Sequence, residues 1–217
     1  MLLFNDKDRI VFTGDSVTDS NRGRPIGAGT WDGVGNGFVR QIDTLLNVCY
    51  PENKYCIINS GVGGNSSRDL LNRWQQDVLD FRPDYIVCCI GFNDVWRQFD
   101  EQTYPDRHVY IDEYEKNLEE MIKLSKGKKM IFMTPYYIEK NKEDEMRKMM
   151  DEYGNVCKKV AEKHGIMCID LQKEFSDYLE YRYSAFLQWD RVHPGWIGSM
   201  IIARAFLRAV GFDRQVI

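Results

Sequence analysis

The chain has no long hydrophobic run, no cluster of basic residues and few histidines. None of its apolar stretches approaches the roughly 20 residues of a membrane span. A formal net charge of −4 without a lysine and arginine stripe argues against nucleic acid or an anionic membrane surface as a partner. The first residues lack the basic segment and the apolar run of a signal peptide. We therefore expect a cytoplasmic protein.

Cysteine motifs typical of metal or redox sites are also missing. The six cysteines include no CxxC pair and no group with metal-ligand spacing. Cys56, Cys88, Cys89 and Cys168 lie inside apolar runs, where a free thiol behaves as a small hydrophobic group. We expect reduced core cysteines in a reducing compartment, and neither a metal nor another cofactor.

Short apolar runs alternate with helical patterns along the chain. The runs are continuous, which is typical of parallel strands covered on both faces, and lie at residues 9–12, 55–58, 85–90, 130–133 and 166–169. Helical spacing of apolar residues occurs at 37–49, 68–81, 111–125, 143–164 and 194–210. This alternation predicts a doubly wound α/β sheet within one domain spanning residues 1–217.

Polar, turn-forming segments follow the first three predicted strands. They are Gly14-Asp15-Ser16, residues 59–66 and Gly91-Phe92-Asn93-Asp94. Ligands of open parallel sheets bind at the carboxyl ends of the strands, so we expect a site where these segments meet. The glycine-rich stretch 17–36 follows Ser16 directly, and loops of that length are usually functional or disordered.

A base for Ser16 must come from three histidines. His164 precedes Gly165 at a predicted helix end, and His108 lies in a surface-like loop without an evident partner. His193 remains, three residues after Asp190. Asp190 could orient this imidazole or simply cap the following helix, and spacing alone does not separate the two.

Acyl transfer needs the residue types that these segments supply. A serine hydroxyl requires an adjacent base, and the tetrahedral oxyanion requires preorganised donors. The backbone N–H groups of Ser16 and Gly64 and the side-chain amide of Asn93 are candidate donors.

The same segments carry a family resemblance. Gly14-Asp15-Ser16, Gly64 within 59–66, Gly91–Asp94 and Asp190–His193 resemble the four blocks of the SGNH hydrolases, also called GDSL-type esterases, in the family's order. The resemblance implies a flavodoxin-like α/β/α sandwich whose five-stranded parallel sheet has the order 2-1-3-4-5. It also implies Ser16 as nucleophile, His193 as base, Asp190 as its orienting group, and Ser16, Gly64 and Asn93 as oxyanion donors. Val17 stands where the family name has leucine, a mild departure.

Further stretches narrow the resemblance. Residues 22–25, 93–97, 133–139 and 189–194 look like those of bacterial intracellular acetylxylan esterases, which deacetylate xylo-oligosaccharides. This implies a small carbohydrate ester as substrate. Our expected substrate-binding residues are Asp15, Trp31, Asn65, Trp96, Arg97 and Trp189. For Trp189 we expect packing in the core at least as strongly as a contact with the substrate.

Two alternatives remain at this stage. A lipid-ester or thioester hydrolase would use the same triad but favour longer acyl chains. A non-catalytic flavodoxin-like module would cradle a phosphate or flavin in its glycine segments. Gly61-Val-Gly-Gly64 has neither a following Lys-Ser/Thr nor GxGxxG spacing, which disfavours the module. Exposed aromatic residues are compatible with a homo-oligomer, but the sequence does not determine its size.

Overall fold

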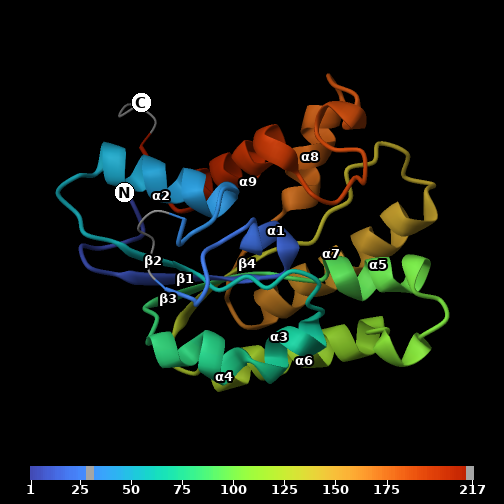
Figure 1. Ribbon diagram of the computed structural model, residues 1–217, viewed down its shortest axis with the longest axis horizontal. Coiled ribbons are helices and arrows are strands. Elements are labelled where there is room, and N and C mark those ends of the chain that lie inside the picture. The colour runs from blue at the N-terminus through green and yellow to red at the C-terminus, as the bar shows by residue number, and fades with distance from the viewer. Residues whose placement is uncertain (28–31, 214–217) are drawn as a thin grey trace.

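The computed structural model describes residues 1–27 and 32–213, and these form a single parallel sheet covered by helices (Figure 1). The strands are β1 (Arg9–Gly14), β2 (Cys56–Asn59), β3 (Tyr85–Cys89), β4 (Lys129–Met133) and β5 (Met167–Ile169). Their order across the sheet is β2-β1-β3-β4-β5, with every pair parallel. This confirms the predicted fold class and strand order.

Helices cover both faces of the sheet. On one face lie α2 (Phe38–Cys49), α8 (Leu171–Leu179) and α9 (Gly195–Ala209) (Figure 1). On the other lie α3 (Ser67–Asn72), α4 (Trp74–Asp77) and α6 (Ile111–Leu124), with α7 (Glu145–Lys163) packed against α6 and α5 (Phe92–Asp100) against α7. The short helix α1 (Ser16–Asp19) follows β1, and 3-10 turns lie at Leu79–Phe81, Pro105–Arg107 and Ser184–Phe186.

The core forms between the sheet and these helices because the strands are apolar on both faces. Phe12 of β1 contacts Phe38 of α2 and Phe206 of α9, with ring centroids 6.0 and 5.2 Å apart. On the opposite face Trp74 is fully buried, and its indole N–H donates to Ser125 Oγ at 3.0 Å. Burial of both faces explains why the strands are continuous apolar runs.

Some helices differ from the sequence prediction. The helix predicted over 68–81 is divided at Arg73 and Val78 into α3, α4 and a 3-10 turn. Helices α1, α5 and α8 were not predicted, since α1 and α5 begin inside the polar motifs that we assigned to turns and loops.

His108 also differs from its prediction. The side chain is only 7% exposed, and its Nε2 lies 3.1 Å from the Glu101 carbonyl oxygen. The expected surface loop without a partner is therefore wrong. His164 does end α7, and it also contacts Glu119 at 2.6 Å.

Cys56, Cys88, Cys89, Cys157 and Cys168 are free thiols in the structure. Within the described ranges, no helix has both the length and the apolarity to cross a membrane.

Candidate active site

Ser16 lies at the carboxyl end of the central strand β1. A Cβ at Gly14 would lie 2.0 Å from the carbonyl oxygen of Cys89 on β3, so only glycine allows the two strands to approach this closely. The chain then turns, and Asp15 Oδ1 accepts the Val17 N–H at 3.0 Å, which caps α1. Ser16 is the first residue of α1 and is half-buried.

The side chains of Ser16, His193 and Asp190 form one hydrogen-bonded chain. Ser16 Oγ lies 2.9 Å from His193 Nε2, and His193 Nδ1 lies 2.7 Å from Asp190 Oδ2. The other Asp190 oxygen accepts the backbone N–H groups of Val192 and His193, each at 3.0 Å. Asp190 therefore does not cap α9, which starts at Gly195, but fixes the turn that carries the imidazole.

The segment after β4 holds this histidine turn in place. Residues 134–138 are buried, and the Ile138 N–H donates to the Arg191 carbonyl oxygen at 2.8 Å. The hydroxyl of buried Tyr136 donates to the Val192 carbonyl oxygen at 3.0 Å. Arg191 has φ 61° and forms an ion pair of 2.6 Å with Glu139. The stretch 133–139 already entered the family resemblance, but no sequence signal shows that it contacts the histidine turn.

Candidate oxyanion donors come from the segments after β2 and β3. Gly64 is exposed and has φ +82°, a conformation that favours glycine. A Cβ at Gly63 would lie 3.9 Å from Ser16 Cβ, which places this segment beside the serine. The buried Asn93 amide donates one N–H to the Asn65 carbonyl oxygen at 3.0 Å, which leaves its second N–H for another acceptor.

Two buried carboxyl groups lie behind these loops. Burial raises the pKa of Asp15 to about 8, and its Oδ2 has no hydrogen-bond partner within the described residues. Burial also raises the pKa of Asp94 to about 7, although hydrogen bonds from Ser67 oppose this shift. Because Asp15 is completely buried, its carboxyl contacts the protein interior, and the predicted contact with a substrate is wrong.

A polar cavity of about 680 Å³ opens beside Ser16 and His193. Asp19 lines it and is held by Arg24, by the Arg22 N–H and by the Gly63 N–H. Residues that we did not predict also line the cavity, and these include Asn36, Gln188, Trp196 and Ser199. Trp196 is 78% exposed. Its position two residues after Pro194 was a sequence signal for a place near the site, and we did not use it.

The other predicted substrate-binding residues occupy varied positions. The Trp96 ring lies 5.8 Å from the His193 ring, whereas Trp189 is 83% exposed. Arg97 forms an ion pair with Asp100 at 2.7 Å. Asn65 Oδ1 accepts a hydrogen bond from Arg73, and Trp31 lies outside the described residues.

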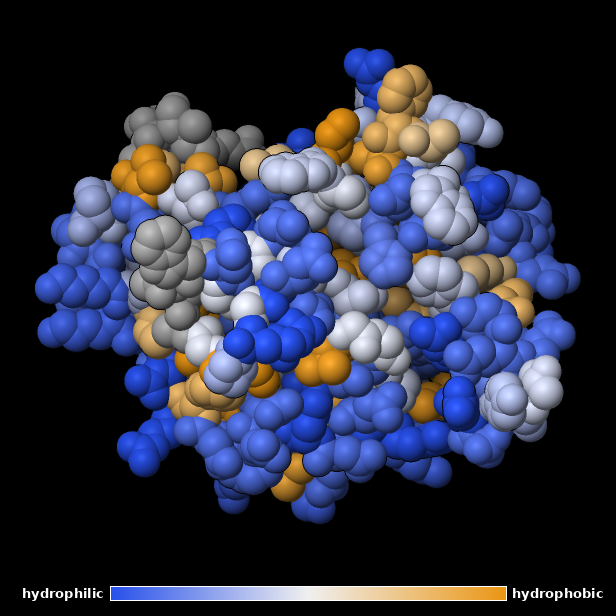
Figure 2. All heavy atoms as spheres, viewed as in Figure 1, coloured by the Kyte–Doolittle hydropathy of each residue, from blue (hydrophilic) through white to orange (hydrophobic). Residues whose placement is uncertain are grey.

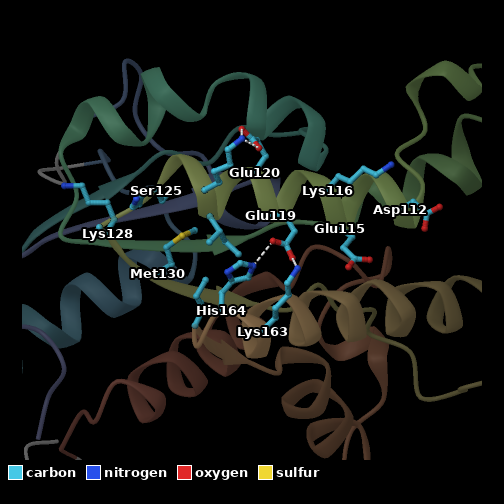
Figure 3. Close-up of a pocket in the computed structure, with 15 residues that line it drawn as sticks. Asp112, Glu115, Lys116, Glu119, Glu120, Ser125, Lys128, Met130, Lys163 and His164 are labelled. Carbon is cyan, nitrogen blue, oxygen red and sulfur yellow. Dashed lines mark hydrogen bonds and ion pairs between the residues drawn. The ribbon is translucent and has the colours of Figure 1, made fainter.

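A larger cavity, of about 1080 Å³, lies along α6 and the end of α7 (Figure 3). Some of its charged side chains pair with one another: Glu119 contacts both Lys163 and His164, and Glu120 contacts Lys123. None of the residues of the Ser16–His193–Asp190 chain lines it. The described parts of the chain contain no group of three or more histidine, cysteine, aspartate or glutamate side chains that could hold a metal ion.

Comparison with known proteins shows the family of the chain. Residues 12–200 match the model of the GDSL-like lipase/acylhydrolase family. The chain belongs to this family. It is a carboxylic ester hydrolase, and the non-catalytic module is not supported.

This family member is similar to several esterases. It is 45% identical over 208 residues to an acetylxylan esterase of Geobacillus stearothermophilus, covering 95% of each chain. The crystal structure of an acetylxylan esterase from that organism is 44% identical, covers 98% of each chain and gives a TM-score of 0.95. An α/β hydrolase from the metagenome of Lake Arreo, Spain, is 44% identical, covers 98% of this chain and 99% of its own, and gives a TM-score of 0.95. Structures of catalytic mutants of the Geobacillus enzyme replace a serine, a histidine or an aspartate by alanine.

Proposed function

We propose that this hydrolase is a serine esterase that removes O-acetyl groups from carbohydrates, with acetylated xylo-oligosaccharides as the substrate. The observation that carries the proposal is the hydrogen-bonded chain Ser16–His193–Asp190 at the edge of a polar cavity. The similarity to the Geobacillus acetylxylan esterase supports the acetyl group and the sugar.

The geometry supports a two-step acyl transfer. Ser16 Oγ attacks the acetyl carbonyl while His193 Nε2 takes its proton, and Asp190 stabilises the resulting imidazolium. The N–H groups of Ser16 and Gly64 and the free N–H of Asn93 bind the oxyanion. His193 then protonates the leaving sugar alcohol. Water activated by the same imidazole hydrolyses the acetyl-Ser16 ester and regenerates the hydroxyl.

The polarity of the surroundings favours a sugar over a long acyl chain. Arginine, asparagine, glutamine and serine side chains line the cavity beside Ser16, together with Trp196. On the face shown in Figure 2, hydrophobic residues of the described chain form small separate patches within a hydrophilic surface. Hydroxyl groups can bond these polar side chains, and Trp196 offers an aromatic face.

Hydrolysis of p-nitrophenyl acetate and p-nitrophenyl octanoate tests the proposal. We expect wild type to cleave the acetate at least tenfold faster, and Ser16→Ala to lose activity by a factor of about 10³ or more, because the nucleophile is gone. Ser176→Ala on α8 is the control, because it removes a serine hydroxyl outside the site and should leave the activity unchanged. Acetate release from acetylated xylo-oligosaccharides then tests the sugar.

Two results would contradict the proposal. Equal rates for wild type and Ser16→Ala would exclude Ser16 as the nucleophile. Faster cleavage of the octanoate would favour the lipid-ester or thioester hydrolase instead.

A further inference from the structure

Arg73 lies between α3 and α4 and directs its guanidinium group toward the carboxyl ends of β1 and β2. Its side chain is only 15% exposed. Nε donates to Asn65 Oδ1 at 2.6 Å, and Nη1 donates to the Ser60 carbonyl oxygen at 2.8 Å. Nη2 donates to the Gly14 carbonyl oxygen at 2.9 Å. One planar group therefore binds three oxygen atoms from two segments, one at the end of β1 and one after β2.

Each of these oxygens belongs to a segment with a task in the proposed mechanism. Gly14 precedes Asp15 and Ser16, so its carbonyl fixes the path of the chain into the nucleophile. Ser60 and Asn65 bracket the segment that carries Gly64. The backbone oxygen of Asn65 accepts the Asn93 amide at 3.0 Å and so orients the third oxyanion donor.

The contacts of Arg73 favour a positioning task over an ordinary ion pair. Its carboxylate neighbour Asp77 lies 3.5 Å away, farther than the three neutral oxygens. A guanidinium group presents several N–H donors in a rigid plane, whereas an ammonium group offers one flexible point charge. A lysine here can replace the charge but not the three simultaneous bonds.

We propose that Arg73 is the positioning residue that sets the relative placement of the three oxyanion donors. This inference rests on the proposed function, since it assigns a task within the same site. Arg73 does not line the cavity beside Ser16, and it acts through Gly14, Ser60 and Asn65. The Ser16–His193–Asp190 chain does not contact it.

The test is steady-state hydrolysis of p-nitrophenyl acetate by Arg73→Lys across a range of pH. We expect kcat to fall roughly 10- to 100-fold, because a displacement of about 1 Å in a catalytic group costs on this order. KM should stay within about threefold. The acid limb of the pH profile should not move, because the imidazole keeps its partners.

Arg9→Lys is the matched control. Arg9 also donates to a backbone carbonyl oxygen, that of Phe81 at 2.7 Å, but at the amino end of β1. We expect this variant to retain wild-type kcat. A threefold or smaller fall in kcat for folded Arg73→Lys would overturn the inference, as would an equal fall for Arg9→Lys.

A second variant covers the case in which Arg73→Lys does not fold. Asn65→Ala removes the shortest bond to the guanidinium and keeps the backbone oxygen that holds Asn93. Because p-nitrophenyl acetate has no sugar hydroxyls, a lost sugar contact does not affect this assay. We expect kcat to fall at least fivefold with little change in KM, and an unchanged kcat would contradict the inference.

The same assay separates the inference from the proposed function. If Ser16→Ala is as active as wild type, the proposed function fails. If Ser16→Ala is inactive and Arg73→Lys retains full kcat, only the inference about Arg73 fails.

Discussion

Asp190 uses its two carboxylate oxygens for different bonds, one to the imidazole and one to the backbone of its own turn. In Asp190→Asn the side-chain oxygen can still accept the two N–H groups, so we expect the turn to fold. The amide nitrogen would then donate to His193 Nδ1 and leave the ring proton on Nε2. A protonated Nε2 cannot accept the Ser16 proton. We expect kcat to fall by as much as about 10⁴, with little change in thermal stability.

Asp170→Asn is the control for this substitution. Asp170 caps α8 through the Lys173 N–H and pairs with Lys158, so it resembles Asp190 in its bonding but lies outside the site. Near wild-type kcat for Asp190→Asn would show that the carboxylate charge has no part in catalysis.

Asp15 is a buried carboxyl group whose protonation affects the stability of the fold. Burial raises its pKa from the ordinary value of 3.8 to about 8, so the folded protein keeps a proton that the unfolded chain releases. The contribution of this proton to stability is complete below pH 4, decreases above it and is lost as the pH passes 8. We expect Asp15→Asn to flatten the pH dependence of the free energy of unfolding between pH 5 and 8 by up to about 1.4 kcal/mol per pH unit.

Urea unfolding at several pH values measures this change. Asp84→Asn is the control, because Asp84 accepts the Arg9 N–H in an exposed position at the other end of the sheet. Identical slopes for wild type and Asp15→Asn would show that Asp15 is ionised in the folded chain.

At the scale of secondary-structure elements, the contact between β1 and β3 depends on Gly14. The Cβ of Gly14→Ala would overlap the Cys89 carbonyl oxygen, which is backbone and cannot rotate away. We expect this variant to lose roughly 3 kcal/mol or more of stability, or to fail to fold. Gly27→Ala, with open space around its Cβ, is the control, and equal melting temperatures for the two variants would contradict the close approach.

The strands were easier to predict than some of the helices. Continuous apolar runs indicate buried parallel strands whatever the neighbouring segments are. Each of the five strands begins and ends within two residues of its predicted bounds. Helix α5 was missed because Asn93 and Asp94 are polar and suggested a loop. Both side chains point into the protein, where they bond Asn65 and Ser67.

The candidate site was predictable where its residues lie in short motifs. Ser16, Asp190 and His193 each follow a strand or precede a helix, and the structure brings their side chains together. Arg73 and Tyr136 gave no such signal, because each donates to a backbone oxygen distant in sequence, that of Gly14 and that of Val192.

At the scale of the whole molecule, the first and last segments of the described chain lie side by side. The Leu3 N–H donates to the Val210 carbonyl oxygen at 2.8 Å, and the Tyr85 hydroxyl donates to the Leu3 oxygen. The amino-terminal segment therefore packs at the end of α9, the helix that directly follows the histidine turn.

The bond between Ser16 and His193 joins residues that are 177 positions apart. During synthesis Ser16 therefore leaves the ribosome well before His193 does. Until His193 has been made, the Ser16 hydroxyl has no imidazole beside it. Under the proposed function, a chain terminated before His193 has no esterase activity.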